Sequence, residues 1–600
     1  MLQRLVGIIG LVSAVVGFSG VQAQSQKPKQ NYYIGEGGVD LQTGSFYHSN
    51  TDIAIGDPQA GGLVLTRTSS TRPNSFSMGG NNGHSQEVTL YRDAYRPNGA
   101  GPGIQAFHHY VVIGEKVYQF EQWEFTTVID NPPGADRTLT KSGTNGPFVF
   151  TDRDGTVINF PVLGTCEKAV YQTWNCSPAT DITRPDGTKT TFTYDLSGAY
   201  KRLRLVSTSR GFGLGFEYNA NKQISRVCAI NTANSYVTST LPCPSGAPSA
   251  LYTYGTGPGV GESWSTFTDP AGVRTDYTYG IYGISSIKKF GNSVNDVSLT
   301  YGLFPASRDA RVTSQTFANG STWTYQYYSD AHPYADEFGN FEESYNPWTR
   351  VIDPNNGQEY NTFLAGTAPK PSDVTDELNR TSSFTWIEVL KDWLPTKKIS
   401  PEGNETRYAY DSRGNQTESR MVAKAGTGLP DIVSTATYAA SCTNRVTCNR
   451  PLTTTDAKGN VTTYTYDATH GGVLTETGPA VNGIQPQKRH EYAQRYAWVK
   501  NSSGGYVQAS PPVWVKTRER YCRTTAASGS SCSGGAIDEV VTDYDYGPNS
   551  GPNNLLLRGI VVTAANGSGV LESLRTCYGY DALGRRISET RPAANLAACP

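Results

Sequence analysis

The chain has 600 residues, with 51 Lys and Arg, 52 Asp and Glu, and a formal net charge of −1. So small a net charge creates no long-range field that would attract nucleic acid or anionic lipid. The chain holds 63 Gly, 34 Pro and 37 Tyr but only 3 Met, a composition that favours strands and turns over helices. We therefore expect a nearly all-β protein without a nucleic-acid partner.

Residues 1–23 have the layout of a secretory signal peptide. Arg4 supplies positive charge, residues 5–16 are apolar or small, and small residues at 21 and 23 suit a cleavage site after Ala23. A retained membrane anchor is the alternative, but the apolar run is shorter than the roughly 20 residues that span a bilayer. No later segment is apolar enough to cross a membrane. We predict a mature chain that is secreted, periplasmic or at the cell surface.

The mature chain divides into two parts by its motifs. Residues 24–164 are predicted to form an N-terminal β region, and residues 165–600 one continuous array of repeats. The repeat is Tyr-x-Tyr-Asp-x-x-Gly, clearest at 408–414 and 578–584. Two aromatics one residue apart share a face of a strand, and Asp-x-x-Gly reverses the chain. Each copy is therefore a β-hairpin.

The spacing and variation of the copies support a repeat array. Tyr194 and Tyr218 are 24 residues apart, within the period range of stacked repeats. A second turn signal lies about nine residues before each Tyr-Asp pair, as at 184–188, 401–404 and 456–460. The repeat-motif positions to which we assign a structural role are Tyr194, Asp195, Gly198, Tyr408, Tyr410, Asp411, Gly414, Tyr464, Tyr466, Asp467, Tyr578, Tyr580, Asp581, Gly584 and Arg585.

A long antiparallel sheet follows from such hairpins. Two-stranded units do not stand alone in water, but consecutive hairpins joined edge to edge form one sheet that twists and curls. The recurrent Asp is expected to cap backbone N–H groups in each turn, and the paired Tyr to stack unit on unit. A ligand-binding role for the aromatics stays open.

Ten cysteines fall into five pairs of near neighbours, which favours an oxidising compartment. Local pairing is the simplest hypothesis, although sequence alone does not fix connectivity. Zinc binding is the weaker alternative, since the chain has no Cys-x-x-Cys. The predicted pairs are Cys166 with Cys176, Cys228 with Cys243, Cys442 with Cys448, Cys522 with Cys532, and Cys577 with Cys599.

The sequence contains none of the common catalytic signatures. We find no phosphate-binding loop, His-Glu-x-x-His or Gly-x-Ser-x-Gly. Residues 152–155 resemble half a calcium loop but also fit a plain hairpin turn. His108 and His109 are adjacent, so on a strand they point to opposite faces. We therefore assign no catalytic residue, no cofactor and no metal site, and expect no enzyme activity.

The repeat resembles the YD-repeat, or RHS-repeat, family, which includes bacterial polymorphic toxins, shell subunits of insecticidal toxin complexes and the teneurins. The resemblance covers roughly residues 183–590, and segments 39–45, 61–67 and 150–156 resemble the lead-in of bacterial members. It implies a sheet that spirals into a hollow shell around a toxin cargo, or presents an adhesion surface. The self-cleavage Asp-Pro segment that closes bacterial shells has no counterpart at the end of this sequence, so cleavage residues are not transferred. The last repeat lies close to Pro600, which leads us to expect that the native chain continues or that another chain completes the array.

Three functions follow as hypotheses. The leading one is a secreted or cell-surface scaffold, the non-catalytic shell portion of a toxin-delivery or contact-dependent interaction protein, with a C-terminal or separate toxin cargo. The second is a surface module that binds glycan or protein through aromatics of irregular loops such as 323–328. The third is a secreted hydrolase on a β scaffold, for which the sequence shows no acid and base pair.

Overall fold

The computed structural model describes residues 34–35, 37–57, 61–70, 82–95, 106–114, 116–123, 126, 128–129, 131, 137–168, 172–195, 201–259, 261–303, 310–328, 348–364, 370–390, 392–594 and 596–599. These residues form 44 strands, one four-residue helix, α1 (Arg445–Cys448), and one 3-10 turn, η3 (Pro592–Ala594). The expected all-β fold is confirmed. No helix among these residues is long and apolar enough to cross a membrane.

Two small antiparallel sheets hold the first part of the chain. One has the order β1-β2-β3 and the other β10-β11-β4-β5-β6. Their strands are β1 (Tyr47–Ile55), β2 (Leu63–Ser70), β3 (Asn82–His84), β4 (Val88–Tyr95), β5 (Ala106–Ile113), β6 (Lys116–Trp123), β10 (Gly164–Lys168) and β11 (Gln172–Pro178).

All but four of the other strands form one long antiparallel sheet of 32 strands. Its hydrogen-bonded order follows the chain from β7 to β44, passing over the strands of the small sheets and side hairpins. The first half comprises β7 (Thr138–Lys141), β8 (Phe148–Thr151), β9 (Val157–Phe160), β12 (Asp181–Thr183), β13 (Lys189–Asp195), β14 (Arg202–Thr208), β15 (Phe212–Tyr218), β16 (Ile224–Asn231), β17 (Ser249–Thr256), β18 (Ser263–Thr268), β19 (Arg274–Gly280), β20 (Gly283–Lys289), β21 (Val297–Leu303), β22 (Ala310–Phe317), β23 (Thr322–Tyr328) and β24 (Trp348–Ile352).

The second half continues in the same way. It comprises β25 (Gln358–Phe363), β26 (Pro371–Thr375), β27 (Thr381–Val389), β28 (Asp392–Ile399), β29 (Glu405–Tyr410), β30 (Gln416–Val422), β31 (Ile432–Thr437), β32 (Thr453–Thr455), β33 (Val461–Tyr466), β34 (Val473–Thr477), β35 (Gln487–Arg495), β38 (Val513–Cys522), β41 (Glu539–Asp545), β42 (Gly559–Ala565), β43 (Leu571–Tyr580) and β44 (Arg586–Thr590). Two side hairpins project from it, β36 (Trp498–Lys500) with β37 (Tyr506–Gln508), and β39 (Ala527–Ser528) with β40 (Ser531–Cys532).

Sheet membership does not change at residue 164. Strands β7 to β9 precede that residue but belong to the long sheet, whereas β10 and β11 follow it and pair with β4. The division of the chain at residue 164 stays a prediction.

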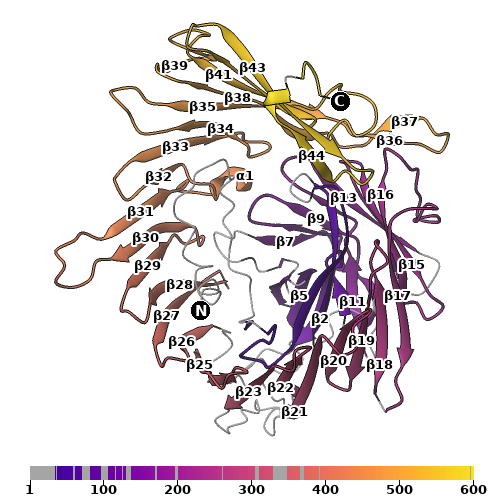
Figure 1. Ribbon diagram of the computed structural model, residues 1–600. Coiled ribbons are helices and arrows are strands. Elements are labelled where there is room, and N and C mark those ends of the chain that lie inside the picture. Colours follow the sequence, from indigo (N-terminus) through magenta and orange to yellow (C-terminus); the bar gives the residue numbers. More distant parts are fainter. Residues whose placement is uncertain are drawn as a thin grey trace.

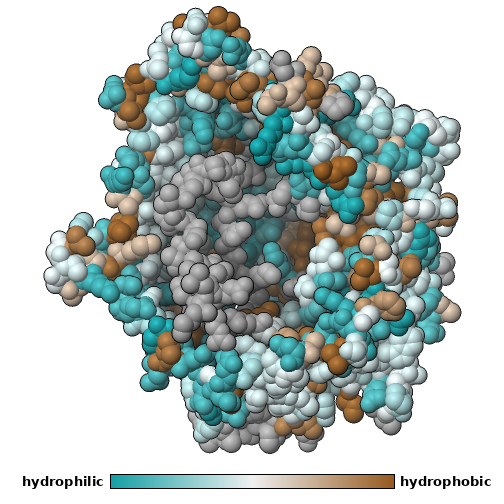
Figure 2. Space-filling view, viewed as in Figure 1, coloured by the Kyte–Doolittle hydropathy of each residue, from teal (hydrophilic) through white to brown (hydrophobic). Residues whose placement is uncertain are grey.

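The long sheet curls around the N-terminal strands. In Figure 1, β2, β5 and β11 lie within the curve that β15 to β35 describe, and β38 to β44 return toward the first strands. The space-filling view is hollowed inside this ring (Figure 2). Curling is the expected outcome for a sheet of this width, because each strand is rotated relative to its neighbour.

The main hydrophobic core lies between the N-terminal strands and the first half of the long sheet. Its buried members run from Val39 to Phe363, and Leu583 is the one member from later in the described chain. Strands beyond β25 bury fewer of their side chains than the strands before it. In β33, for example, exposed and half-buried side chains alternate along the strand. The second half therefore depends more on hydrogen bonding and cross-strand contacts than on a deep apolar core.

Candidate functional site

In the repeats at Asp411, Asp467 and Asp581, the Asp forms the turn that the sequence predicts for it. At 411–414, the Asp411 carboxylate accepts hydrogen bonds from the N–H groups of Arg413 and Asn415, both at 2.9 Å. Gly414 has φ +74°, which a side chain would strain. Asp581 caps its turn in the same way, accepting from Leu583 and Arg585. These carboxylates are occupied by backbone groups.

The second aromatic of many repeats lies at an irregularity in the sheet, although Tyr254 and Tyr327 lie in regular register. Ten register shifts occur in the described part of the long sheet, and each falls directly before an aromatic residue. One extra residue at such a bulge bends the strand and increases its twist. The aromatics are Tyr194, Tyr218, Tyr279, Tyr301, Phe363, Trp386, Tyr410, Tyr466, Tyr492 and Tyr580.

A hydrogen-bonded ladder joins one bulge to the next. Tyr410 donates its hydroxyl to the carbonyl of Pro395 at 2.8 Å, and Pro395 is the residue that faces Trp386 across the preceding bulge. Trp386 in turn donates Nε1–H to the carbonyl of Pro371, which faces Phe363.

In eight such bonds along the chain the acceptor carbonyl belongs to the residue that faces an aromatic across a preceding bulge, and we call this set the aromatic ladder. Its eight bonds run from Tyr218 to Leu203, Tyr254 to Ile224, Tyr301 to Ile284, Tyr327 to Val312, Trp386 to Pro371, Tyr410 to Pro395, Tyr438 to Gln416 and Tyr492 to Val473. Tyr466 and Tyr580 donate to the carbonyls of Pro451 and Leu557.

The tyrosine hydroxyls of the aromatic ladder stay protonated at neutral pH. Burial raises the pKa of Tyr327 well above its ordinary value, and burial also raises the pKa of Tyr410. Both hydroxyls therefore remain protonated donors at neutral pH. A protonated phenol bound to a backbone carbonyl neither takes up a proton nor attacks a substrate. The geometry assigns the ladder to holding adjacent repeats together.

The other motif residues are distributed as follows. Tyr194 and Asp195 end β13, Tyr408 and Tyr410 lie in β29, Tyr464 and Tyr466 in β33, and Tyr578 and Tyr580 in β43, while Asp411, Gly414, Asp467, Asp581, Gly584 and Arg585 lie in the turns that follow. Gly198 falls outside the described residues.

A buried ion pair within the first small sheet is hydrogen-bonded to two tyrosines of the long sheet. Arg67 Nε donates to Asp52 Oδ2 at 2.9 Å, and both side chains are almost fully buried. Tyr252 donates to the same carboxylate at 2.8 Å, and Arg67 Nη2 donates to the Tyr277 hydroxyl at 3.0 Å. Because a buried charge is costly unless it is paired and hydrogen-bonded, this network fixes the position of β1 and β2 inside the ring.

The lead-in segment 37–46 is held by β22 to β24. Gln315 Nε2 donates to the carbonyl of Gly37 at 2.8 Å, and the N–H of Val312 donates to the carbonyl of Gly44 at 2.9 Å. Thr349 donates its hydroxyl to the carbonyl of Leu41. The long sheet thus binds this segment largely through the segment's backbone.

Four of the five predicted cysteine pairs are disulfides in the structure. They are Cys228–Cys243, Cys442–Cys448, Cys522–Cys532 and Cys577–Cys599. Cys176 is also disulfide-bonded, while the side chain of Cys166 lies outside the described set.

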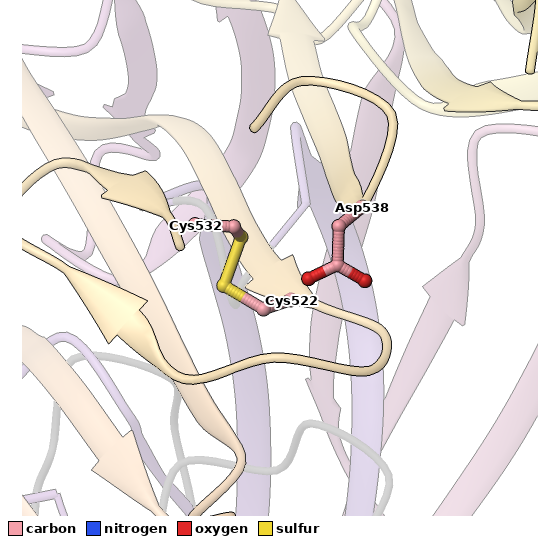
Figure 3. A group of neighbouring side chains, drawn as sticks. All are labelled: Cys522, Cys532 and Asp538. Atoms are coloured by element: carbon pink, nitrogen blue, oxygen red, sulfur yellow. A yellow bond between two sulfur atoms is a disulfide. The ribbon is translucent and has the colours of Figure 1, made fainter. Parts of the chain in front are cut away.

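One group of possible metal ligands occurs among the described residues, formed by Cys522, Cys532 and Asp538 (Figure 3). The two sulfurs are bonded to each other, so neither is a thiolate. The Asp538 carboxylate accepts from the backbone and hydroxyl groups of Thr524 and Thr525. Burial raises the pKa of Asp538, but these hydrogen bonds outweigh it and bring the pKa to about 2. The group is therefore a structural junction.

The two other possible metal sites that the sequence suggested, the adjacent histidines and the Asp-Gly turn, have side chains that contact other residues of the protein. His109 is fully buried, with Nε2 2.9 Å from Oε1 of Gln122, while His108 lies on the other side of β5. Asp152 pairs with Arg137 at 3.1 Å and accepts from the N–H of Arg153. Each of these side chains already has protein partners.

The prediction of an irregular loop at 323–328 is wrong, because these residues belong to β23. Strand alternation divides their aromatics between two faces: Tyr325 is 3% exposed and Tyr328 48%. Tyr328 stacks on Trp348 of the neighbouring strand, with centroids 5.0 Å apart, and Trp348 contacts Tyr360. The exposed aromatics are thus a cross-strand set that sequence proximity did not reveal.

Comparison with known proteins finds likeness only among solved structures. No family model matches the chain, and no curated protein matches it. A crystal structure of TcdB2-TccC3-TEV has 12% identity and a TM-score of 0.31, covering 82% of this chain and 23% of that chain. A crystal structure of TcdB2-TccC3 has 10% identity and a TM-score of 0.28, covering 88% of this chain and 39% of that chain.

A third similar structure is a Photorhabdus luminescens Tc holotoxin pore. It has 10% identity and a TM-score of 0.26, covering 93% of this chain and 34% of that chain. The chain thus spans well under half the length of each of these three proteins.

Proposed function

We propose that this chain is an enclosing scaffold, the shell portion of a secreted or cell-surface YD/RHS-repeat protein. The observation that carries the proposal is the curl of one continuous sheet around strands from its own N-terminus (Figure 1). Beyond the main core, which packs the first half of the sheet on the N-terminal strands, the wall of hairpins continues with fewer buried apolar side chains and is linked by the aromatic ladder. That property suits a container.

The finer parts of the proposal rest on the sequence. The signal-peptide layout supports export, and the repeat resemblance supports a polypeptide toxin as cargo, attached to this chain or separate from it. The motif carboxylates and tyrosines have structural partners, which supports a role without catalysis. Turnover of any substrate on broad glycan and peptide panels would contradict that last part.

Protease protection of the native protein tests the enclosing role. The protein is purified from its source without denaturant, treated with proteinase K and analysed by peptide mass spectrometry. We expect peptides of β1 and β2, and of any associated cargo, to resist digestion while the exposed side hairpin β36–β37 is cut. Cleavage of β1 and β2 as fast as that hairpin would contradict an enclosing shell.

A second candidate function is recognition of a glycan or protein at the cell surface. The observation that favours it is the set of partly exposed aromatics Tyr328, Trp348 and Tyr360 on adjacent strands, with Gln326 hydrogen-bonded to Arg350 beside them. Aromatic rings beside planar polar groups suit a sugar. Glycan-array binding lost in Tyr328→Ala but kept in Tyr236→Ala, a change at another exposed ring, would support it.

A further inference from the structure

Three histidines of the two small sheets face the long sheet, and each packs its ring against an aromatic ring of that sheet. We call them the interface histidines. Their ring centroids lie 5.7 Å apart for His48 in β1 and Tyr277 in β19, 5.7 Å for His84 in β3 and Phe216 in β15, and 5.6 Å for His109 in β5 and Phe148 in β8. Both small sheets therefore contact the long sheet through imidazole rings.

His109 is held as a neutral ring. It is fully buried, and its Nε2 lies 2.9 Å from Oε1 of Gln122. Gln122 donates its own amide to the carbonyl of Thr126, so Oε1 is the acceptor and Nε2 of His109 carries the proton. Nδ1 of His109 is buried without a hydrogen-bond partner among the described residues. A second proton, which would go to Nδ1, finds no acceptor in this part of the structure.

The charges around His109 also oppose a second proton. Lys141 of β7 donates Nζ to the same Gln122 oxygen at 2.9 Å, and Arg92 of β4 is the register partner of His109. Burial lowers the pKa of His109 to about 4; the hydrogen bond to Gln122 opposes this shift, and Arg92, Lys141 and His108 add to it. Protonation would place a third positive charge beside Arg92 and Lys141.

His48 faces charges of both signs. Its Nε2 lies 3.4 Å from the Tyr277 hydroxyl, which accepts a hydrogen bond from Arg67. Burial and the Arg67 charge lower the pKa of His48 to about 4, although the Asp52 charge raises it in part. Because Asp52 is already bound by Arg67 and by the hydroxyl of Tyr252, it compensates a charge on His48 only weakly.

His84 has a carboxylate beside it, but burial has the larger effect. Its ring is almost fully buried, and Nδ1 accepts from the N–H of Gln86 at 3.2 Å. Nε2 therefore carries the proton and lies 3.4 Å from Oε1 of Glu87, while Arg67 faces His84 in register on β2. Burial lowers the pKa of His84, although Glu87 and Asp52 raise it in part. A second proton would go to Nδ1 and break the hydrogen bond from Gln86.

We propose that the interface histidines make the contact between the small sheets and the long sheet acid-sensitive, so that it loosens before the second half of the ring does. Each ring takes up one proton as it reaches water. A group with a lowered folded pKa stabilises fully above its unfolded value, here 6.5, and loses that contribution as pH falls toward the folded value. For His48 and His109, with folded pKa values of about 4, moving from pH 7.5 to pH 5 should favour opening by roughly 30-fold each.

The inference goes beyond the enclosing role, because it concerns how the ring holds its inner sheets and not what the ring contains. A ring without an enclosed polypeptide would refute the container and leave the acid response intact. The repeat turns of the second half should not respond in this range. The Asn460 side chain, for example, holds the pKa of Asp456 below its usual value, so that carboxylate stays ionised at pH 5.

Hydrogen–deuterium exchange of the full chain at pH 7.5 and pH 5, corrected for the intrinsic amide rate at each pH, tests the proposal. We expect the protection of β1 and β5 peptides to fall at least about tenfold at pH 5. Peptides of β30 and β31, a strand pair of the second half without histidine, should change less than twofold. An equal change in the two groups, or none in β1 and β5, would overturn the proposal.

Variants separate the histidines from other acid-sensitive groups. The triple variant with His48→Gln, His84→Gln and His109→Gln should keep the protection of β1 and β5 within about twofold between the two pH values. The matched variant His470→Gln changes a histidine that is also buried against two aromatic rings, but within the long sheet, and should retain the tenfold fall. A fall that persists in the triple variant, or disappears in His470→Gln, would overturn the proposal.

Exchange at the imidazole C2 position of the wild-type protein keeps the test decisive if the triple variant folds poorly. Mass spectrometry follows this exchange for each histidine as a function of pH. We expect His48 and His109 to titrate at least about one unit below the ordinary histidine pKa of about 6.5. Titration of either ring near pH 6.5 would overturn the proposal.

Discussion

The aromatic ladder predicts that two tyrosines of one repeat contribute very differently to stability. Tyr410 and Tyr408 lie two residues apart in β29, and both are half-buried. Tyr410 donates to the carbonyl of Pro395 at 2.8 Å, while the Tyr408 hydroxyl makes no hydrogen bond within the described part of the chain. Tyr410→Phe should therefore cost about 1 kcal/mol, the net value of one hydrogen bond, and Tyr408→Phe less than about 0.5 kcal/mol.

The cost of a ladder bond should rise where the ladder meets the core. Tyr327 packs against the main hydrophobic cluster and donates to Val312 at 2.8 Å. Water reaches the orphaned carbonyl less easily there, so Tyr327→Phe should cost about 2 kcal/mol, within the range for an unsatisfied buried group.

The assay combines urea unfolding with hydrogen exchange of strand peptides, because repeat arrays often unfold in parts. Exchange should accelerate in β28 and β29 for Tyr410→Phe and remain unchanged for Tyr408→Phe. Equal costs for the two substitutions of this repeat would refute the ladder as a source of stability.

Three further outcomes follow from the N-terminal strands. Arg67→Met leaves the Asp52 carboxylate buried without its cation and should cost about 3–5 kcal/mol, measured by urea unfolding; a cost below about 1 kcal/mol would show that the pair is not buried. Burial and the Arg67 charge lower the pKa of His48 to about 4, although the Asp52 charge raises it in part, so the protein favours neutral His48. Stability should be full above pH 6.5, the unfolded value, and fall as pH drops toward 4, by at most about 3 kcal/mol at 1.36 kcal/mol per pKa unit; His48→Gln should flatten that slope. Gly44 has φ +71°, and a Cβ there would lie 2.5 Å from Cβ of Arg311, so Gly44→Ala should cost more than about 1 kcal/mol, whereas an unchanged unfolding midpoint would contradict the seating of the lead-in segment.

The hairpin rhythm could be predicted because its causes are local. The Tyr-x-Tyr spacing fixes a strand face, and the Asp411 and Gly414 turn chemistry acts within five residues. The local disulfides follow similarly from cysteines that are near neighbours in sequence.

The aromatic ladder and the contact of Leu583 with the N-terminal part of the chain could not be predicted from the sequence, because both depend on the register of the strands. Tyr410 lies 15 residues after its acceptor Pro395, but Tyr254 lies 30 residues after Ile224, since loops of different length separate the strands. The recurrent placement of an aromatic after a small or polar residue was a signal, but it did not identify a bulge. Nothing in the sequence around Leu583 distinguishes it from other turn residues.

The misplaced aromatics at 323–328 have a related cause. The run of Trp and Tyr there was taken for an exposed loop, whereas it is β23, whose alternation buries Tyr325 and exposes Tyr328. The partners of Tyr328 come from β24 and β25. Only the register of the sheet brings them together.

Cryo-electron microscopy of the intact chain under non-reducing conditions tests the central claim most directly. We expect one sheet curled around β1 to β6, with the turn of Leu583 seated against Gly56 and Phe212. An open or extended sheet, with the N-terminal strands outside it and the two ends apart, would contradict an enclosing scaffold.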